Sequence, residues 1–325
     1  MKAVLCHEFG SIDNLTLDDI PSPKVGAGQV KIRVRACGVN FPDLLLAQGL
    51  YQVKPPLPFS PGLEVAGEIS EIGEGLDGLH VGQRVVSTLM WGGFAEEVLA
   101  PGAMTLPISP ALSYEAAAAI PLAYGTAHVA LAHRAQLKLG ETLLVLGAAG
   151  GVGLAAVELG RLLGARVIAA ASTSKKLELA RKYGADEIIN YSSESLRDRV
   201  KSLTDGRGAD VIFDPVGGDI FDQALRRIAW EGRYLVIGFA SGRIPSAPAN
   251  IILLKNASIV GVFWGTYWQR DAATLQRSFG QLMTWLDADK LKPHIHKTYS
   301  LANAVDALRE LQERRAMGKV VLTMP

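Results

Sequence analysis

The chain has 325 residues, of which 49% are hydrophobic and 20% are charged. This balance excludes disorder as the main state, and the length suggests two domains of about 100–200 residues each. Lysine and arginine together number 33 against 32 acids, so the net charge is +1 and no overall field attracts nucleic acid or an anionic membrane. The only cysteines are Cys6 and Cys37, which excludes a disulfide scaffold and a four-cysteine zinc site.

No segment of the sequence has the pattern of a targeting or membrane-spanning element. The first eight residues become polar before the apolar core of a signal peptide can develop. The most apolar stretch, residues 116–132, is shorter than the roughly 20 residues that span a bilayer, and Pro121, Gly125 and His128 interrupt it. We therefore expect a cytoplasmic protein with no membrane partner.

The first part of the chain, up to about residue 122, has the pattern of short strands separated by proline and glycine. Residues 30–36 alternate apolar and basic side chains, the period of a half-buried strand, and residues 65–72 and 84–88 are similar. This pattern predicts an irregular, mostly β domain.

The pattern then changes to short β-rich runs, each followed by a turn and an amphipathic helix. The predicted strands are residues 143–146, 166–170, 187–191, 211–214, 234–237 and 258–262. Strands that alternate with helices are joined by crossover connections, which predicts an α/β domain with a doubly wound parallel sheet. After about residue 265 we expect a helix, a strand at 294–299, a second helix at 302–314 and a closing strand at 319–323, all packed on the first domain.

A glycine turn follows the first of these strands. Residues 147–153 read GAAGGVG and lead into an alanine-rich helix. Glycines let the backbone approach a pyrophosphate, and the helix N-terminus supplies free N–H groups and partial positive charge. The spacing is G-x-x-G-x-x-G rather than the commoner G-x-G-x-x-G, and a tight turn without a ligand is the alternative. The strand before it and the helix after it favour a dinucleotide site.

The end of the next strand indicates which dinucleotide is bound. Ser172 stands where an NAD-specific domain places a carboxylate for the ribose 2′-hydroxyl, and Lys175 and Lys176 follow. A hydroxyl with a nearby ammonium can hold a 2′-phosphate, which a carboxylate would repel. NADPH is therefore favoured, the alternative being that the two lysines only solvate the start of a helix.

Four segments carry a resemblance to a known family. They are residues 37–43 (CGVNFPD), 61–67 (PGLEVAG), 148–153 (AAGGVG) and 314–322 (RRAMGKVVL). Over essentially its whole length the chain resembles a medium-chain dehydrogenase/reductase of the zinc-independent quinone oxidoreductase branch, which includes ζ-crystallin. The resemblance implies a GroES-like catalytic domain from residues 1–123 and 265–325, with a Rossmann NADP-binding domain from residues 124–264 between them.

Two departures from the zinc alcohol dehydrogenases of this superfamily concern the metal. Those enzymes have a cysteine ligand where this chain has Asn40, and a histidine ligand where it has Leu63. Leucine cannot bind zinc and an asparagine amide is a poor ligand for it, so we expect no catalytic zinc.

The resemblance also implies cofactor contacts. Gly150, Gly151 and Val152 would hold the pyrophosphate, and Ser172, Lys176 and Tyr191 would surround the 2′-phosphate. Further contacts implied are Asn40, Thr126, Phe239, Ala240, Ser241, Phe263, Trp264 and Arg314, with Arg315 as the alternative to Arg314.

For catalysis the resemblance places residues 40–51 in the substrate cleft. Asn40 can donate its amide to a carbonyl oxygen, and Tyr51 can donate its hydroxyl. Asp43 is a third candidate, although an Asp at this point can instead cap the helix that begins there. His128 and His133 lie five apart in a predicted helix, off the i,i+4 spacing that a metal favours.

The expected protein is an NADPH-dependent, zinc-independent quinone oxidoreductase that transfers hydride to a quinone or a related conjugated carbonyl. One alternative is a 2-alkenal or enoyl-thioester reductase, for which Tyr51 could supply the proton. Another is a non-enzymatic NADPH-binding protein with a structural or RNA-binding role, which the near-neutral charge disfavours. We expect a homodimer, since residues 258–264 form an apolar β-rich run at the expected sheet edge.

Overall fold

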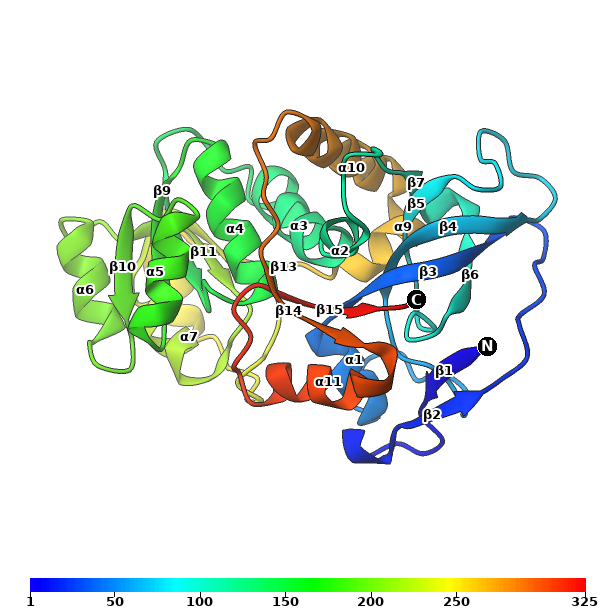
Figure 1. Cartoon of the computed structure of the whole chain (residues 1–325). Coiled ribbons are helices and arrows are strands. Elements are labelled where there is room, and N and C mark those ends of the chain that lie inside the picture. Colours follow the sequence, from blue (N-terminus) through cyan, green and yellow to red (C-terminus); the bar gives the residue numbers. More distant parts are fainter. The chain divides into compact units, whose positions relative to one another are not determined.

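The computed structural model describes residues 1–325, and the chain divides into two compact units (Figure 1). The first unit comprises Met1–Leu122 and Pro293–Pro325, and the second comprises Ala123–Lys292. The second unit is thus an insertion in the first.

A seven-stranded sheet organises the first unit. Its order is β14-β15-β3-β4-β5-β7, with β6 paired to β3, and β1 and β2 form a separate pair. The strands are β1 (Lys2–Leu5), β2 (Thr16–Asp19), β3 (Gln29–Val39), β4 (Glu64–Ile72), β5 (Arg84–Thr88), β6 (Glu97–Pro101), β7 (Thr105–Pro107), β14 (Ile295–Ser300) and β15 (Lys319–Thr323). The helices are η1 (Ile12–Asn14), α1 (Phe41–Ala47), η2 (Gly102–Met104), α2 (Tyr114–Ala118), η5 (Leu301–Asn303) and α11 (Ala304–Gln312).

The alternation seen in the sequence has a direct counterpart in β3. Val30, Ile32 and Val34 are at most 1% exposed and belong to the core of this unit. Of the three basic residues that alternate with them, Arg33 is exposed, Arg35 is half-buried and Lys31 is buried. β3 continues beyond the predicted end at residue 36 because Cys37, Gly38 and Val39 pair with β15. A segment from the C-terminal end of the chain therefore completes this sheet.

The second unit contains a six-stranded parallel sheet in the order β10-β9-β8-β11-β12-β13. Its strands are β8 (Thr142–Leu146), β9 (Arg166–Ala171), β10 (Glu187–Asn190), β11 (Ala209–Asp214), β12 (Ile228–Val236) and β13 (Ser258–Gly261). The helices are α3 (Pro121–His128), which starts in the last residues of the first unit, then the π-helix η3 (Val129–Arg134), α4 (Gly151–Leu162), α5 (Ser174–Lys182), α6 (Leu196–Leu203), α7 (Gly218–Leu225), α8 (Ala249–Lys255), η4 (Trp264–Thr266), α9 (Tyr267–Arg270) and α10 (Ala272–Asp287).

The central strand β8 shows why this sheet forms. Leu143, Leu144, Val145 and Leu146 have no exposed surface, which is typical of a parallel strand with helices on both faces. The predicted α/β fold with a doubly wound parallel sheet and a separate, mostly β unit is confirmed. β12 begins earlier than predicted: Glu231 and Gly232 have the composition of a turn, yet the strand runs through them with a register shift against β11.

The second unit is larger than expected, because residues 265–292 pack with it rather than with the first unit. α10 buries Leu275, Phe279 and Leu282, and the ring of Phe279 lies edge-on to Trp264 with centroids 6.0 Å apart. The Ser278 hydroxyl and His128 Nδ1 are 2.9 Å apart, which ties α10 to the end of α3. The helical period was visible in the sequence, but it does not specify which core the apolar face meets.

Candidate functional site

The predicted dinucleotide turn lies between β8 and α4. Gly150 is the N-cap of α4 and provides no side chain to satisfy the first N–H groups of the helix, which remain suited to an anion. Gly147 has φ +57°, a conformation that glycine adopts without strain. At Gly153 a Cβ would lie 2.2 Å from the Gly147 carbonyl oxygen, so only glycine allows the helix to start this close to the strand.

Ser172, Lys176 and Tyr191 lie at the same edge of the sheet as this turn. β9 pairs with β8 and β10 pairs with β9, all parallel, so their carboxyl ends are neighbours. The Tyr191 N–H donates to the Ala171 carbonyl at 3.2 Å, which places Tyr191 beside the end of β9. Lys176 lies in the first turn of α5, and its backbone N–H donates to the Thr173 hydroxyl at 3.4 Å. The edge thus gathers a hydroxyl, an ammonium and a phenol.

The residues expected beside the nicotinamide follow β12 and β13. The Ala240 N–H donates to the Pro215 carbonyl at 3.1 Å and the Ser241 N–H to the Val216 carbonyl at 2.9 Å, which holds residues 239–241 against the segment after β11. Phe263 is 44% exposed, whereas Trp264 is 7% exposed.

Trp264 is mainly a packing residue within the second unit. A Cβ at Gly125 would lie 2.9 Å from Trp264 Cζ2, so the indole lies directly on the helix that carries Thr126. The indole Nε1 is buried without a hydrogen-bond partner.

Asn40 and Arg314 lie in the first unit, unlike the other predicted cofactor contacts. Arg314 follows α11, is exposed, and has φ +57°. Its neighbour Arg315 donates from Nε to Glu310 Oε2 at 3.1 Å. The side chain of Arg315 is thus bound to a carboxylate of its own unit.

The three predicted catalytic residues come together around the start of α1. Asn40 is the N-cap and is half-buried, Asp43 has no exposed surface, and Tyr51 is half-buried against the core of this unit. Asp43 accepts the Asn40 N–H at 2.7 Å and the Gly62 N–H at 2.9 Å. Asp43 thus binds the backbone of the N-cap residue, the structural role that an Asp in the first turn of a helix can have.

Burial controls the ionisation of this cluster. Removal from water raises the pKa of Asp43 to about 7, against the opposing effect of the two N–H donors and of Lys319. Burial also raises the pKa of Tyr51, and the carboxylate of Asp43 raises it further. The phenol of Tyr51 is therefore protonated at neutral pH and is able to donate.

A buried ion pair adjoins Asn40. Lys319 Nζ lies 2.7 Å from Glu64 Oε1, and the two side chains are 4% and 0% exposed. Lys319 also donates to Asn40 Oδ1 at 2.5 Å, and Asn40 Nδ2 donates to Glu64 Oε1 at 2.8 Å and to the Gly38 carbonyl at 3.1 Å. Both N–H groups of the Asn40 amide are therefore engaged within the first unit, so a substrate carbonyl has to replace one of these two acceptors.

His128 and His133 line the same pocket of the second unit. His128 is the last residue of α3 and His133 lies in the π-helix η3 that follows; the pocket has a volume of about 390 Å³. No group of three or more His, Cys, Asp or Glu side chains in the chain is arranged to hold a metal ion.

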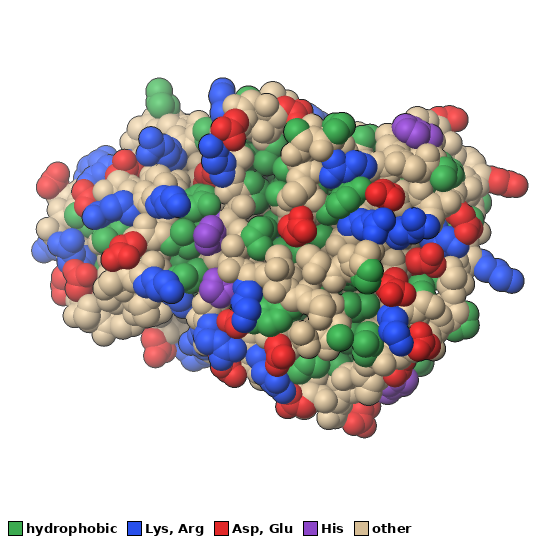
Figure 2. Space-filling model, viewed as in Figure 1, with side chains coloured by type: hydrophobic (Ala, Val, Ile, Leu, Met, Phe, Trp, Pro, Cys, Tyr) green, Lys and Arg blue, Asp and Glu red, His purple; other side chains and the backbone are tan.

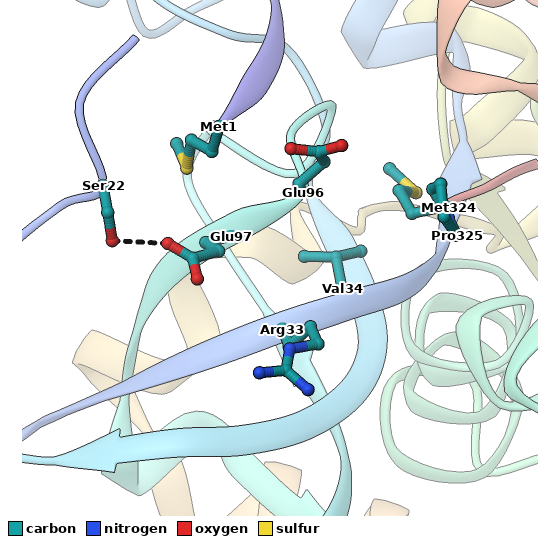
Figure 3. A pocket seen from close by; sticks show the side chains of 8 residues that line it. All are labelled: Met1, Ser22, Arg33, Val34, Glu96, Glu97, Met324 and Pro325. Atoms are coloured by element: carbon teal, nitrogen blue, oxygen red, sulfur yellow. Dashed lines mark hydrogen bonds between the residues drawn. The ribbon is translucent and has the colours of Figure 1, made fainter.

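A second pocket, of about 340 Å³, lies in the first unit (Figure 3). Arg33, Glu96 and Glu97 supply its charged side chains, and the Ser22 hydroxyl donates to Glu97. None of the predicted site residues lines it. On the face drawn in Figure 2, positive and negative side chains are interspersed, without a continuous field of one sign. No helix has the length and apolar character needed to cross a membrane.

Known proteins match both units. The alcohol dehydrogenase GroES-like domain model matches residues 26–110, and the zinc-binding dehydrogenase model matches residues 151–285. The quinone oxidoreductase-like protein 2 homolog of Nematostella vectensis is 42% identical over 324 residues, which are 99% of this chain and 88% of that protein. The chain belongs to the quinone oxidoreductase family of the medium-chain dehydrogenase/reductase superfamily.

Solved structures agree with this membership. The quinone oxidoreductase of Pseudomonas syringae is 32% identical, with a TM-score of 0.93 and 99% coverage of both chains. The Escherichia coli quinone oxidoreductase in complex with NADPH is 27% identical, with a TM-score of 0.92 and full coverage of both chains. The family resemblance that the four sequence segments indicated is confirmed, and the protein is an oxidoreductase.

Sequence reasoning overlooked Glu64 and Lys319, although both lie in segments that carried the resemblance. Each is a single charge at the start of an otherwise apolar strand, EVAG in β4 and KVVL in β15. A charge at a position that the strand pattern buries needs a partner of opposite sign, and the two residues are each other's partner. That signal was available in the sequence.

Proposed function

We propose that this oxidoreductase binds NADPH and reduces a quinone, or a related conjugated carbonyl, by hydride transfer and without zinc. The observation that carries the proposal is the carboxyl edge of the parallel sheet, where the glycine turn opens α4 and Ser172 and Lys176 follow the neighbouring strand. The complex of the E. coli quinone oxidoreductase with NADPH supports the same cofactor here.

The residues at this edge fit the cofactor. At Gly150 a Cβ would meet only the Gly147 carbonyl oxygen, at 3.5 Å, so the start of α4 has room for a pyrophosphate. The N–H groups of Gly151 and Val152 would bind it there, beside Gly150, whose own N–H donates to the Gly147 carbonyl at 3.0 Å. Ser172, Lys176 and Tyr191 would surround the 2′-phosphate. When bound, NADPH supplies the hydride, and residues 239–241 with Phe263 would position its nicotinamide.

Two features of the first unit support a reaction without zinc. Leu63, at the histidine-ligand position of the zinc enzymes, is 7% exposed and belongs to the hydrophobic core. Asn40, at the cysteine-ligand position, has its amide bound to Lys319, Glu64 and Gly38. An ammonium 2.5 Å from the Asn40 oxygen would repel a cation at that position.

Quinone reduction needs little acid catalysis, because water can protonate the hydroquinone anion. A 2-alkenal or enoyl thioester needs a proton at the α carbon, and the protonated phenol of Tyr51 is suited to give it. Initial rates with NADPH against quinones, enals and enoyl thioesters decide between these substrates. Tyr51→Phe should slow enal reduction at least tenfold and leave quinone reduction within about twofold.

Lys176 and Ser172 test the cofactor assignment. A charge-assisted bond to the 2′-phosphate is worth about 1.5–3 kcal/mol, which corresponds to about a ten- to hundredfold effect. Lys176→Ala should raise the KM for NADPH by about that factor and leave the KM for NADH nearly unchanged, and Ser172→Asp should act in the same direction more strongly. Lys175→Ala, the exposed neighbour, is the matched control and should leave the ratio of NADPH to NADH efficiency at the wild-type value. The assignment is wrong if Lys176→Ala and Ser172→Asp also keep that ratio.

We also propose that the protein is a homodimer that pairs through the second unit. β13 is an edge strand of the six-stranded sheet, so one side of its backbone lacks a partner strand. Large apolar side chains are exposed in β12 and α8, the elements next to it in the fold: Trp230 is 61%, Leu253 76% and Leu254 72% exposed. A second copy that extends the sheet would cover this surface.

A further inference from the structure

Lys319 is a buried cation whose hydrogen-bonding capacity is fully used. Its ammonium has three acceptors, Glu64 Oε1 at 2.7 Å, Asn40 Oδ1 at 2.5 Å and the Val39 carbonyl at 3.3 Å. A lysine ammonium has three hydrogens, so none is left for a ligand. The side chain is 4% exposed, and Lys319 itself therefore cannot contact a substrate.

Glu64, on the other side of the Asn40 amide, likewise accepts three hydrogen bonds. Its Oε1 accepts from Lys319 and from Asn40 Nδ2, and its Oε2 accepts the Leu122 N–H at 2.8 Å. Room for the carboxylate comes from Gly38, where a Cβ would lie 2.2 Å from Glu64 Oε1. Any side chain at position 38 would therefore overlap with the carboxylate of this ion pair.

The ion pair determines which way the Asn40 amide points. The carbonyl oxygen faces the ammonium and the amide nitrogen faces the carboxylate. A rotation by 180° about χ2 would set an NH2 donor against the ammonium and an acceptor against the carboxylate, two repulsive contacts in place of two charge-assisted bonds. Asn40 is the half-buried member of this group, next to Asp43 and Tyr51.

We propose that Lys319 is a positioning residue that, together with Glu64, fixes the Asn40 amide for the carbonyl substrate. The inference rests on the proposed function and adds how the Asn40 amide is held in one orientation for the substrate. The bond of Asn40 Nδ2 to Gly38, the longer of its two, is the one that a substrate oxygen would replace, while the bond to Glu64 stays in place. Lys319 also neutralises Glu64, whose uncompensated charge would repel the anion that hydride addition creates on the substrate oxygen.

The test compares two backgrounds. Lys319→Met together with Glu64→Gln removes both charges, so no buried ion is left without a partner. This double variant should lower kcat/KM for the quinone by about 10- to 100-fold, through kcat more than through the KM for NADPH. In an Asn40→Ala background the same double variant should cost less than about threefold, because its effect acts through the amide.

The matched control is the ion pair of the other buried lysine of this unit, whose partner carboxylate is 49% exposed. Lys31 in β3 pairs with Glu71, and neither touches a predicted site residue. Lys31→Met with Glu71→Gln should lower kcat/KM by less than about twofold in both backgrounds. Lys319→Arg restores the cation and should recover most of the activity that Lys319→Met loses.

The outcomes distinguish a failure of the positioning role of Lys319 from a failure of the proposed quinone reduction. If Asn40→Ala lowers kcat/KM but the double variant costs the same factor in both backgrounds, Lys319 has only a structural role and the inference is overturned. The inference is also overturned if Lys319→Arg folds but has a kcat/KM as low as that of Lys319→Met. This comparison replaces the double variant if the double variant does not fold. If the wild-type enzyme reduces no quinone with NADPH, the proposed function fails instead.

Discussion

Asp43 offers a test of the cluster at the start of α1 that needs no substrate. The carboxyl group has no exposed surface, and burial raises its pKa to about 7, whereas an aspartate in an unfolded chain has a pKa of about 3.9. Between these two values the folded protein binds one proton more than the unfolded chain. The free energy of unfolding must therefore fall as the pH rises through this window.

The magnitude follows from the width of the window. Each pH unit well inside it changes the free energy of unfolding by about 1.4 kcal/mol, and the slope falls off near pH 7, where the folded group is half ionised. Raising the pH from 5 to 7 should therefore cost the wild-type protein about 2 kcal/mol through Asp43 alone. Asp43→Asn cannot ionise and should lose this dependence. The variant should instead lose stability by an amount that does not depend on pH. Its amide has a single oxygen, so it can accept only one of the two N–H groups, of Asn40 and Gly62, that Asp43 accepts.

Urea unfolding followed by circular dichroism at pH 5, 6, 7 and 8 measures the effect as the difference between wild type and Asp43→Asn, in which the other titrating groups cancel. Asp77→Asn, a change at an exposed aspartate, is the control and should run parallel to the wild type. Parallel curves for wild type and Asp43→Asn between pH 5 and pH 7 would refute the reasoning, because the carboxylate would then be as well stabilised in the fold as in water.

Three other predictions concern the glycine turn, the metal and the assembly. Gly153→Ala should lower the melting temperature by several degrees in calorimetry, because its Cβ would lie 2.2 Å from a backbone oxygen, while Gly280→Ala, with open space in α10, should raise it through a gain of about 1 kcal/mol in helix propensity. Quinone reduction should survive prolonged treatment with a chelator, and turnover that is lost and returns only with zinc would contradict the proposal. Leu254→Glu should convert a dimer into a monomer in light scattering, whereas a wild-type protein that is already monomeric at all concentrations would argue against pairing through α8 and β13.

The sequence by itself determined the elements and the order in which they occur. The strand at residues 143–146, the glycine turn and the helix that follows were readable because turn geometry and hydrophobic period are local properties, set by residues within a few positions of one another. The position of Ser172 and Lys176 beside that turn also followed from the sequence, since parallel strands joined by helices bring their carboxyl ends to one edge.

The tertiary structure decided what depends on partners far away in the chain. Lys319 and Glu64 are 255 residues apart, and only the pairing of β15 with β3 and of β3 with β4 brings the ammonium and the carboxylate to the Asn40 amide. The apolar face of α10 was visible, but contact with Trp264 and His128 assigned it to the second unit. Burial is a property of the assembled core, so the charge state of Asp43 and the orientation of Asn40 follow from the fold and not from any local pattern.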